Sequence, residues 1–128
     1  MTSSIYAKGF RATAAAIAGY LIVKASAANG TVEIAGANTD LLIGVADSLG
    51  VEASGIADIS LVGQGEVLLG GTVAFGDPLT ADANAAAIKA LPANSTQVRI
   101  IGFAHAAGVA GDIIPYHIAP GCLSKASA

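Results

Sequence analysis

Tryptophan is absent from this chain, and all aromatic residues together make up only 5% of its 128 residues. Hydrophobic residues nevertheless account for 54%, so the apolar side chains are mainly Ala, Val, Ile and Leu. Side chains of this size each bury little surface, and burial stabilises a fold by about 25 cal/mol per Å². Because a single domain this small has little core to spare, we expect neighbouring chains to supply part of the stabilisation.

Charged residues are also scarce, at 12%, and the formal net charge is −3. A monomer that keeps its whole surface in water usually carries more charge, so we expect partners to cover part of this one. Nucleic-acid binding depends largely on clustered Lys and Arg, and the basic residues here are dispersed, which argues against a direct nucleic-acid partner. The basic residues are Lys8, Arg11, Lys24, Lys89, Arg99 and Lys125.

The chain has a single cysteine, Cys122, so no disulfide can form within it, and a reducing compartment is the simplest interpretation. No Cys and His residues have the spacing of a metal site. His105 and His117 are the only histidines, and neither accompanies the G-x-S-x-G pattern of a hydrolase. We expect no enzyme, no catalytic residue, no metal and no cofactor, although a small hydrolase using one of these histidines stays an alternative.

Long hydrophobic runs are missing as well. The uncharged stretch near the start, residues 12–23, is shorter than the roughly 20 residues that a membrane-spanning helix needs. We therefore expect no transmembrane segment and no membrane partner.

Short β-type segments separated by glycine-rich turns are what the chain does contain. Residues 20–24 and 31–35 flank Asn29-Gly30, a strong hairpin dipeptide, so these two strands are expected to pair. Residues 41–46 form a continuous apolar run, which is typical of a strand buried on both faces. The predicted strands are residues 20–24, 31–35, 41–46, 57–62, 66–69, 72–75, 97–104 and 112–118.

This regular spacing of short strands predicts an all-β fold, either a small single-domain β-barrel or a sandwich, over residues 19–128. Gly63-Gln64-Gly65 is expected to separate two of the strands. Residues 81–91 fit either a helix or a hairpin, and Pro92 ends whichever element forms there. Residues 1–18 contain few β-formers and are predicted to be an extended N-terminal arm.

The order of several segments resembles that of the capsid decoration proteins, or cement proteins, of tailed bacteriophages. The resemblance covers residues 20–120, and its most specific parts are the turn Gly76-Asp77-Pro78 with Asp82 beyond it and two G-x-A motifs. The family often has Gly and Lys after the position of Asp82, whereas this chain has Asn84-Ala85-Ala86. The matching segments are residues 20–24, 43–46, 73–82, 101–104 and 108–114.

The resemblance implies a small β-rich homotrimer on the outer surface of an expanded phage head. Such a protein is made in the host cytoplasm, becomes part of the virion, and stabilises contacts between subunits of the major capsid protein. No cofactor is implied.

For such a protein we expect the N-terminal arm to lie across a neighbouring subunit. Ile5, Tyr6 and Phe10 would be its apolar anchors, and Lys8 and Arg11 would meet carboxylates of the shell. An arm folded back on its own domain is the alternative.

Two further functions stay open. One is another structural subunit of the virion, from the shell or the tail tube, which would assemble without a preformed lattice. The other is a carbohydrate- or receptor-binding β module, for which the small number of aromatic residues gives little support.

Overall fold

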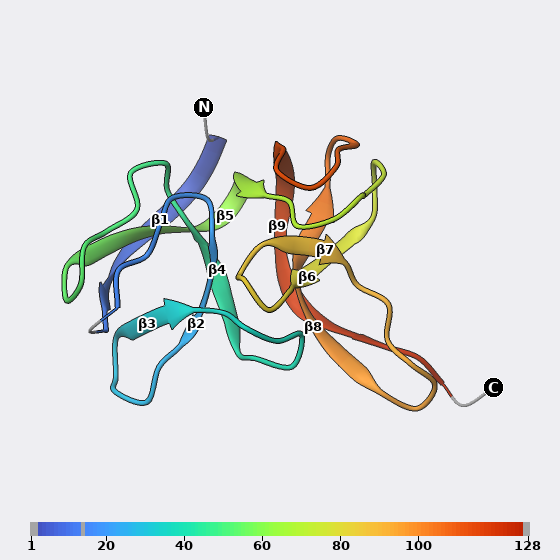
Figure 1. Cartoon of the computed structure of the whole chain (residues 1–128), viewed down its shortest axis with the longest axis horizontal. Coiled ribbons are helices and arrows are strands. Elements are labelled where there is room, and N and C mark those ends of the chain that lie inside the picture. Colours follow the sequence, from blue (N-terminus) through green and yellow to red (C-terminus); the bar gives the residue numbers. More distant parts are fainter. Residues whose placement is uncertain (1–2, 14, 127–128) are drawn as a thin grey trace.

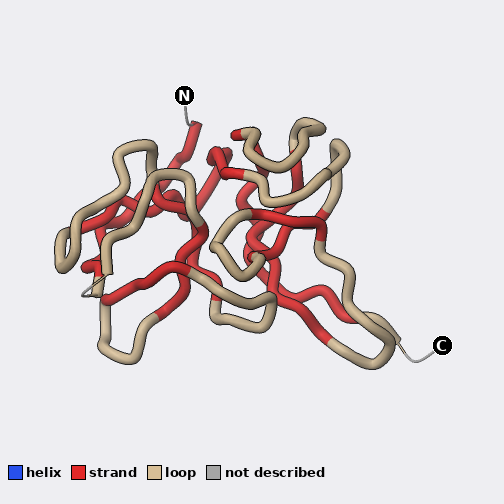
Figure 2. The backbone as a smooth tube through the Cα atoms, viewed as in Figure 1, coloured by secondary structure: helices blue, strands red, loops and turns tan. Residues whose placement is uncertain are grey.

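The computed structural model describes residues 3–13 and 15–126, with side chains from Lys8 onward. These residues form strands and no helix, which confirms the predicted all-β class (Figure 2). The strands are β1 (Ser3–Ala12), β2 (Ile22–Ala25), β3 (Thr31–Ile34), β4 (Leu42–Ala46), β5 (Ile56–Leu68), β6 (Pro78–Ala81), β7 (Ala87–Lys89), β8 (Gln97–Ala104) and β9 (Ile113–Ser124).

Five of the strands close into a barrel, which forms the left half of Figure 1. Its order is β1-β3-β2-β4-β5, and pairing between β1 and β5 completes the ring. The β1–β3 pair is parallel and the other four pairs are antiparallel. Closure leaves the barrel strands without a long open edge.

The strand β5 belongs to both halves of the molecule. Its first part pairs with β1, and its last residues, Gln64 to Leu68, pair with β9. The break expected at Gly63-Gln64-Gly65 is absent, because these residues continue the strand. Gly63 has φ +98°, and a side chain on Gly65 would lie 2.9 Å from the Tyr116 ring. The two glycines therefore allow a bend and a close ring contact within one strand.

Beyond β5 the sheet continues as β9-β8-β6-β7, which forms the right half of Figure 1. All pairs in this part are antiparallel. A bulge on β9 sets Ala119 and Pro120 opposite Ile101, so Pro120, which has no N–H, occupies a position outside the regular ladder.

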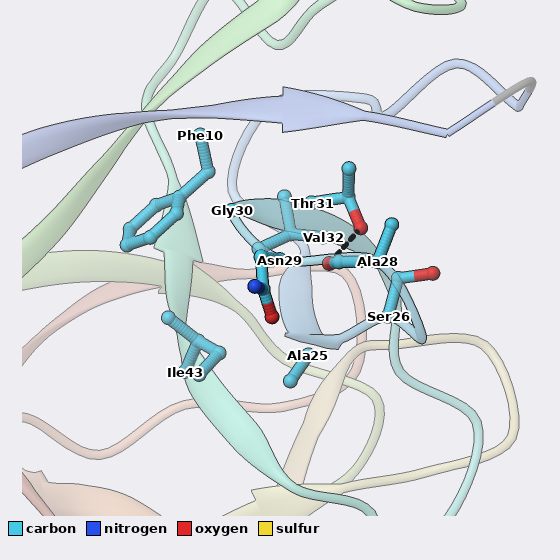
Figure 3. Close-up of a pocket in the computed structure, with 9 residues that line it drawn as sticks. All are labelled: Phe10, Ala25, Ser26, Ala28, Asn29, Gly30, Thr31, Val32 and Ile43. Carbon is cyan, nitrogen blue, oxygen red and sulfur yellow. Dashed lines mark hydrogen bonds between the residues drawn. The ribbon is translucent and has the colours of Figure 1, made fainter.

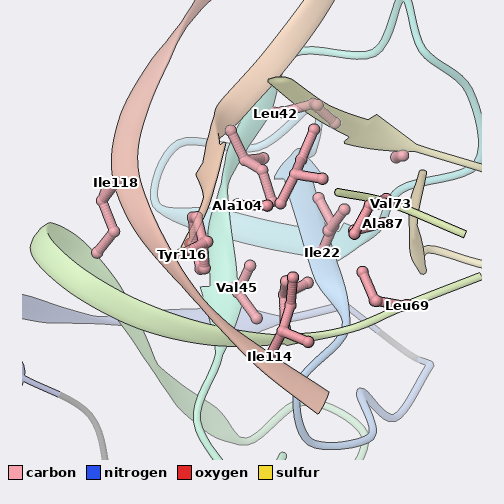
Figure 4. Close-up of a cluster of buried hydrophobic side chains, with 14 of the residues drawn as sticks. Ile22, Leu42, Val45, Leu69, Val73, Ala87, Ala104, Ile114, Tyr116 and Ile118 are labelled. Atoms are coloured by element: carbon pink, nitrogen blue, oxygen red, sulfur yellow. The ribbon is translucent and has the colours of Figure 1, made fainter. Parts of the chain in front are cut away.

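Two main cores follow from this arrangement. One fills the barrel and contains Ala12, Ile17, Val23, Val32, Ala46, Ala57 and Ile59. The other lies between the outer face of β2 and β4 and the second part of the sheet, and Figure 4 shows Ile22 and Val45 pointing toward Leu69, Ile114 and Tyr116.

The apolar runs in β2 and β4 are explained by these two cores. Adjacent residues of a strand point to opposite faces, so Ile22 faces one core and Val23 the other. In β4, Val45 likewise faces the core shared with the second part of the sheet, and Ala46 faces the barrel core. The predicted burial of residues 41–46 on both faces is therefore correct for most of the run.

The first residues differ from the extended arm that we expected. As β1, they pair with β5 from Ser3 to Arg11 and with β3 at Arg11 and Ala12. Ala12 and Ile17 are buried in the barrel core. If β1 were absent, the strands β5 and β3 would present unpaired backbone groups. Pairing with β1 within the same chain satisfies these groups. The segment thus folds back on its own domain, which was the alternative.

Three other segments differ from the predicted elements or decide between the predicted alternatives. Residues 72–75 make only an isolated bridge, between Val73 and Gly108. Residues 78–89 form the hairpin β6–β7, and Asp82 accepts hydrogen bonds from the backbone N–H groups of Asn84 and Ala86 in its turn. Those two bonds fix the turn in place of a helix start. The last strand extends to Ser124 because β8 offers partners along its length.

Candidate functional site

Of the five side chains proposed for the arm, the structure describes those of Lys8, Phe10 and Arg11. Phe10 is half-buried and packs against the barrel core. The Nζ atom of Lys8 lies 5.7 Å from the centre of the Phe10 ring, and Nη1 of Arg11 donates a hydrogen bond of 3.1 Å to the carbonyl oxygen of Ser54. Both cationic side chains are nevertheless exposed. The side chains of Ile5 and Tyr6 lie outside the described part of the structure.

A hollow of about 220 Å³ lies at the end of the barrel where Phe10 is found (Figure 3). Phe10 and Ile43 border it together with the turn between β2 and β3, in which Thr31 Oγ1 donates a hydrogen bond to the carbonyl oxygen of Ala28. None of the residues lining it is ionisable, and the volume is below that of ordinary ligand sites. The lining residues are Phe10, Ala25, Ser26, Ala28, Asn29, Gly30, Thr31, Val32 and Ile43.

Gly76, Asp77 and Pro78 form a tight turn that leads into β6. Gly76 has φ +91°, and its N–H donates to the carbonyl oxygen of Ala104 at 2.7 Å. The Asp77 carboxylate accepts a hydrogen bond of 2.9 Å from the N–H of Ala74 and lies 3.8 Å from Nζ of Lys89. The turn therefore holds the start of β6 against the end of β8, a structural role.

The two histidines lie together on the exposed face of β9 and β8. Their rings stack with centres 5.8 Å apart, and Nδ1 of His105 lies 3.4 Å from Oε1 of Gln64. In a hydrolytic triad a carboxylate would orient the imidazole, whereas here the polar partner of His105 is an amide oxygen. The arrangement gives a hydrolase no specific support.

Within residues 3–13 and 15–126, no three His, Cys, Asp or Glu side chains gather closely enough to hold a metal ion. None of the described residues belongs to a helix long and apolar enough to cross a membrane.

Among the described residues, Asp40 and Tyr116 have shifted pKa values, and each shift has a structural cause. Backbone N–H groups of Gly36 and Ala37 donate to the Asp40 carboxylate at 2.8 and 3.0 Å, and Lys24 lies 3.6 Å away, so the pKa of Asp40 is lowered. Burial raises the pKa of the Tyr116 phenol, which lies in the core between the barrel and the second part of the sheet.

Comparison with known proteins gives a likeness of fold. The chain is similar to the crystal structure of the N base of the head fiber gp8.5 in bacteriophage phi29, with a TM-score of 0.64 and 19% sequence identity. The likeness covers 93% of this chain and 95% of that chain. No protein-family model matches the sequence, and no curated protein matches it. Identity this low shows a shared fold over nearly the whole of both chains.

Proposed function

We propose that this protein is a structural protein of a phage head. In this proposal it binds the outer surface of the head as a homotrimer, contacts the major capsid protein and stabilises the contacts between its subunits. The single observation that supports the proposal most is the likeness in fold, over nearly the whole chain, to the base of a phage head fiber. The segment order that resembles decoration proteins supports it independently.

The physical character of the chain supports the same proposal. Its core is built from small side chains, and several large apolar side chains remain exposed, among them Leu49, Phe75 and Leu91. Apolar surface of this kind is stabilised when partners cover it. On a head with many equivalent sites, a modest interface per copy adds up to a large stabilisation of the whole particle.

The experiment mixes the purified chain with expanded, undecorated heads of its phage and sediments them together. Co-sedimentation at a fixed number of copies per head, with heads that resist higher temperature, is the expected result. Heads that pellet without the chain would contradict the proposal. An unrelated small β-barrel protein at the same concentration controls for nonspecific pelleting.

Two other functions give different results in the same assay. A shell or tail-tube subunit would assemble into particles or tubes on its own, without added heads. A carbohydrate- or receptor-binding module would ignore heads and bind glycans or host-cell envelopes instead. We propose further that the chain is not an enzyme, and hydrolase assays of a His105→Ala, His117→Ala variant against the wild type test that part.

A further inference from the structure

Five side chains from four segments gather on the outer face of the second part of the sheet. Gln64 of β5, His117 of β9 and Phe103 of β8 are in register across three adjacent strands, so their side chains lie beside one another on one face. His105 follows β8, and its ring lies 5.8 Å from His117 and 6.5 Å from Phe75, measured between ring centres. We name Gln64, Phe75, Phe103, His105 and His117 the aromatic patch.

The aromatic patch lies on the face opposite a core. Residues that alternate with its members in β5 and β9, such as Val67, Ile114 and Tyr116, are buried against the barrel. The patch residues point the other way, and Phe75 and Phe103 remain 73% and 38% exposed. Ordinary sheets present polar side chains on such a face. Two Phe and two His gathered on one face are therefore unusual for a face left in water.

The polarity of the patch indicates what covers it. It contains no Lys, Arg, Asp or Glu. Along β5 and β9 the same face continues with Glu66 and with the pair Leu68 and Ile113, which are in register. Beside Phe75, the Asp77 carboxylate has Lys89 as its ion-pair partner, which gives the patch a polar rim.

A surface centred on a threefold axis contacts the same surface of the other copies. Each residue near the axis must therefore be compatible with identical residues of those copies. Identical charges repel there, whereas aromatic rings pack together and the side chains of Gln and His can form hydrogen bonds with their own kind. All five residues of the patch are Phe, His or Gln. A surface made to meet a different protein would be free to carry charge of one sign.

From this chemistry we infer that the aromatic patch is the contact between copies of this chain, centred on the threefold axis of its homotrimer. The inference rests on the homotrimer in the proposed function and adds the surface that forms it. It assigns the two stacked histidines a role in assembly. The barrel, with the exposed Lys8 and Arg11, is left to face other partners.

The test introduces carboxylates at the axis. Phe103→Glu places three negative charges together, and Gln64→Glu does so with almost no change of shape. Leu91→Glu and Gln97→Glu are the matched controls, because both residues are exposed and lie outside the patch. Circular dichroism and thermal unfolding establish that each variant folds, and the isosteric Gln64→Glu keeps the test informative where Phe103→Glu fails to fold.

Sedimentation equilibrium of the full chain then gives the oligomer mass. The inference predicts that the wild type and both controls are trimers, and that both patch variants dissociate at concentrations more than about tenfold higher than the wild type. Trimeric patch variants would overturn it, as would a monomeric wild type.

Binding to heads separates this inference from the proposed function. Patch variants that remain trimers but no longer bind heads would assign the patch to the shell and overturn the inference alone. A wild-type monomer that still binds heads would overturn the inference together with the homotrimer of the proposed function, and would leave head binding itself supported. A trimer that ignores heads, with patch variants that dissociate, would support the inference and contradict the proposed function.

Discussion

Gly102 in β8 lies directly against the carbonyl oxygen of His117 in β9, with no room for a side chain between them. A methyl group built on Gly102 would overlap that oxygen, and the φ of +150° at this glycine is one that other residues rarely adopt. The contact stands beside the β9 bulge, where the sheet bends. It therefore fixes the geometry of the strands that carry the aromatic patch.

The first prediction concerns this contact. Gly102→Ala is expected to lower the free energy of unfolding by about 4 kcal/mol or more, because backbone on both strands must move. Gly121→Ala is the matched control in the same strand pair, where an added methyl meets nothing within 4 Å. It should change stability by less than about 0.5 kcal/mol. Urea denaturation measures both, and similar values for the two variants would contradict the account.

The second prediction concerns the turn before β6. At Gly76 a methyl group would also meet nothing within 4 Å, but the φ of +91° disfavours any other residue. Gly76→Ala should therefore cost about 1 kcal/mol, well below the cost at Gly102. A loss as large as that of Gly102→Ala would mean that this turn tolerates no adjustment.

The third prediction uses the buried hydroxyl of Tyr116, which has no hydrogen-bond partner among the described residues. Removing an unsatisfied buried hydroxyl relieves a desolvation cost, so Tyr116→Phe should be as stable as the wild type or more stable by about 1 kcal/mol at pH 7. A clear loss of stability, measured by urea denaturation, would indicate that the hydroxyl is bonded.

The same residue predicts an effect of pH. Because burial raises the pKa of Tyr116 in the folded state, the unfolded chain loses the phenol proton first, at a pH near the ordinary value of 10.0. The contribution of the neutral phenol to stability is fully present below that pH and is lost as pH rises above it. Tyr116→Phe lacks this loss, so its advantage over the wild type should grow above pH 10 and stay constant below it. An advantage independent of pH would be inconsistent with the burial.

The fourth prediction concerns Asp40, whose contribution to stability depends on pH in the opposite direction to that of Tyr116. The folded-state pKa of Asp40 is lowered by two backbone N–H donors and by Lys24, so its contribution to stability is present above its ordinary pKa of 3.8 and fades as pH falls below that value. Asp40→Asn should be less stable than the wild type at pH 7, and the difference should shrink in acid. A difference that persists unchanged to pH 2 would show that the charge is unimportant.

The strands buried on both faces could be predicted from the sequence, because their residues carry the pattern themselves. The run at residues 41–46 and the hairpin around Asn29-Gly30 need only local information. The strand β1 could not be recognised in this way. Its Ser, Lys, Gly and Arg residues are poor strand formers, and it is held by β5, which lies about 50 residues away along the chain.

Of the candidate functional surfaces, one could likewise be predicted from the sequence and another could not. The turn at Gly76-Asp77-Pro78 is visible in the sequence because its residue types are those that tight turns require. The aromatic patch is not, since Gln64, Phe75 and His117 are distant in sequence and meet only through the register of β5, β9 and β8. In the sequence, Phe103 and His105 are two residues apart and Ile113 and His117 are four apart, a spacing that places each pair on one face of a strand. Only the pairing of the strands brings the two pairs together.

The central claim is that this chain binds and stabilises a phage head, and the thermal stability of decorated heads tests it most directly. Expanded heads are heated with and without the purified chain, and release of packaged DNA is followed by a fluorescent dye. The account predicts that the chain co-sediments with the heads and raises the temperature of DNA release. Heads that release DNA at the same temperature, with the chain left in the supernatant, would contradict it.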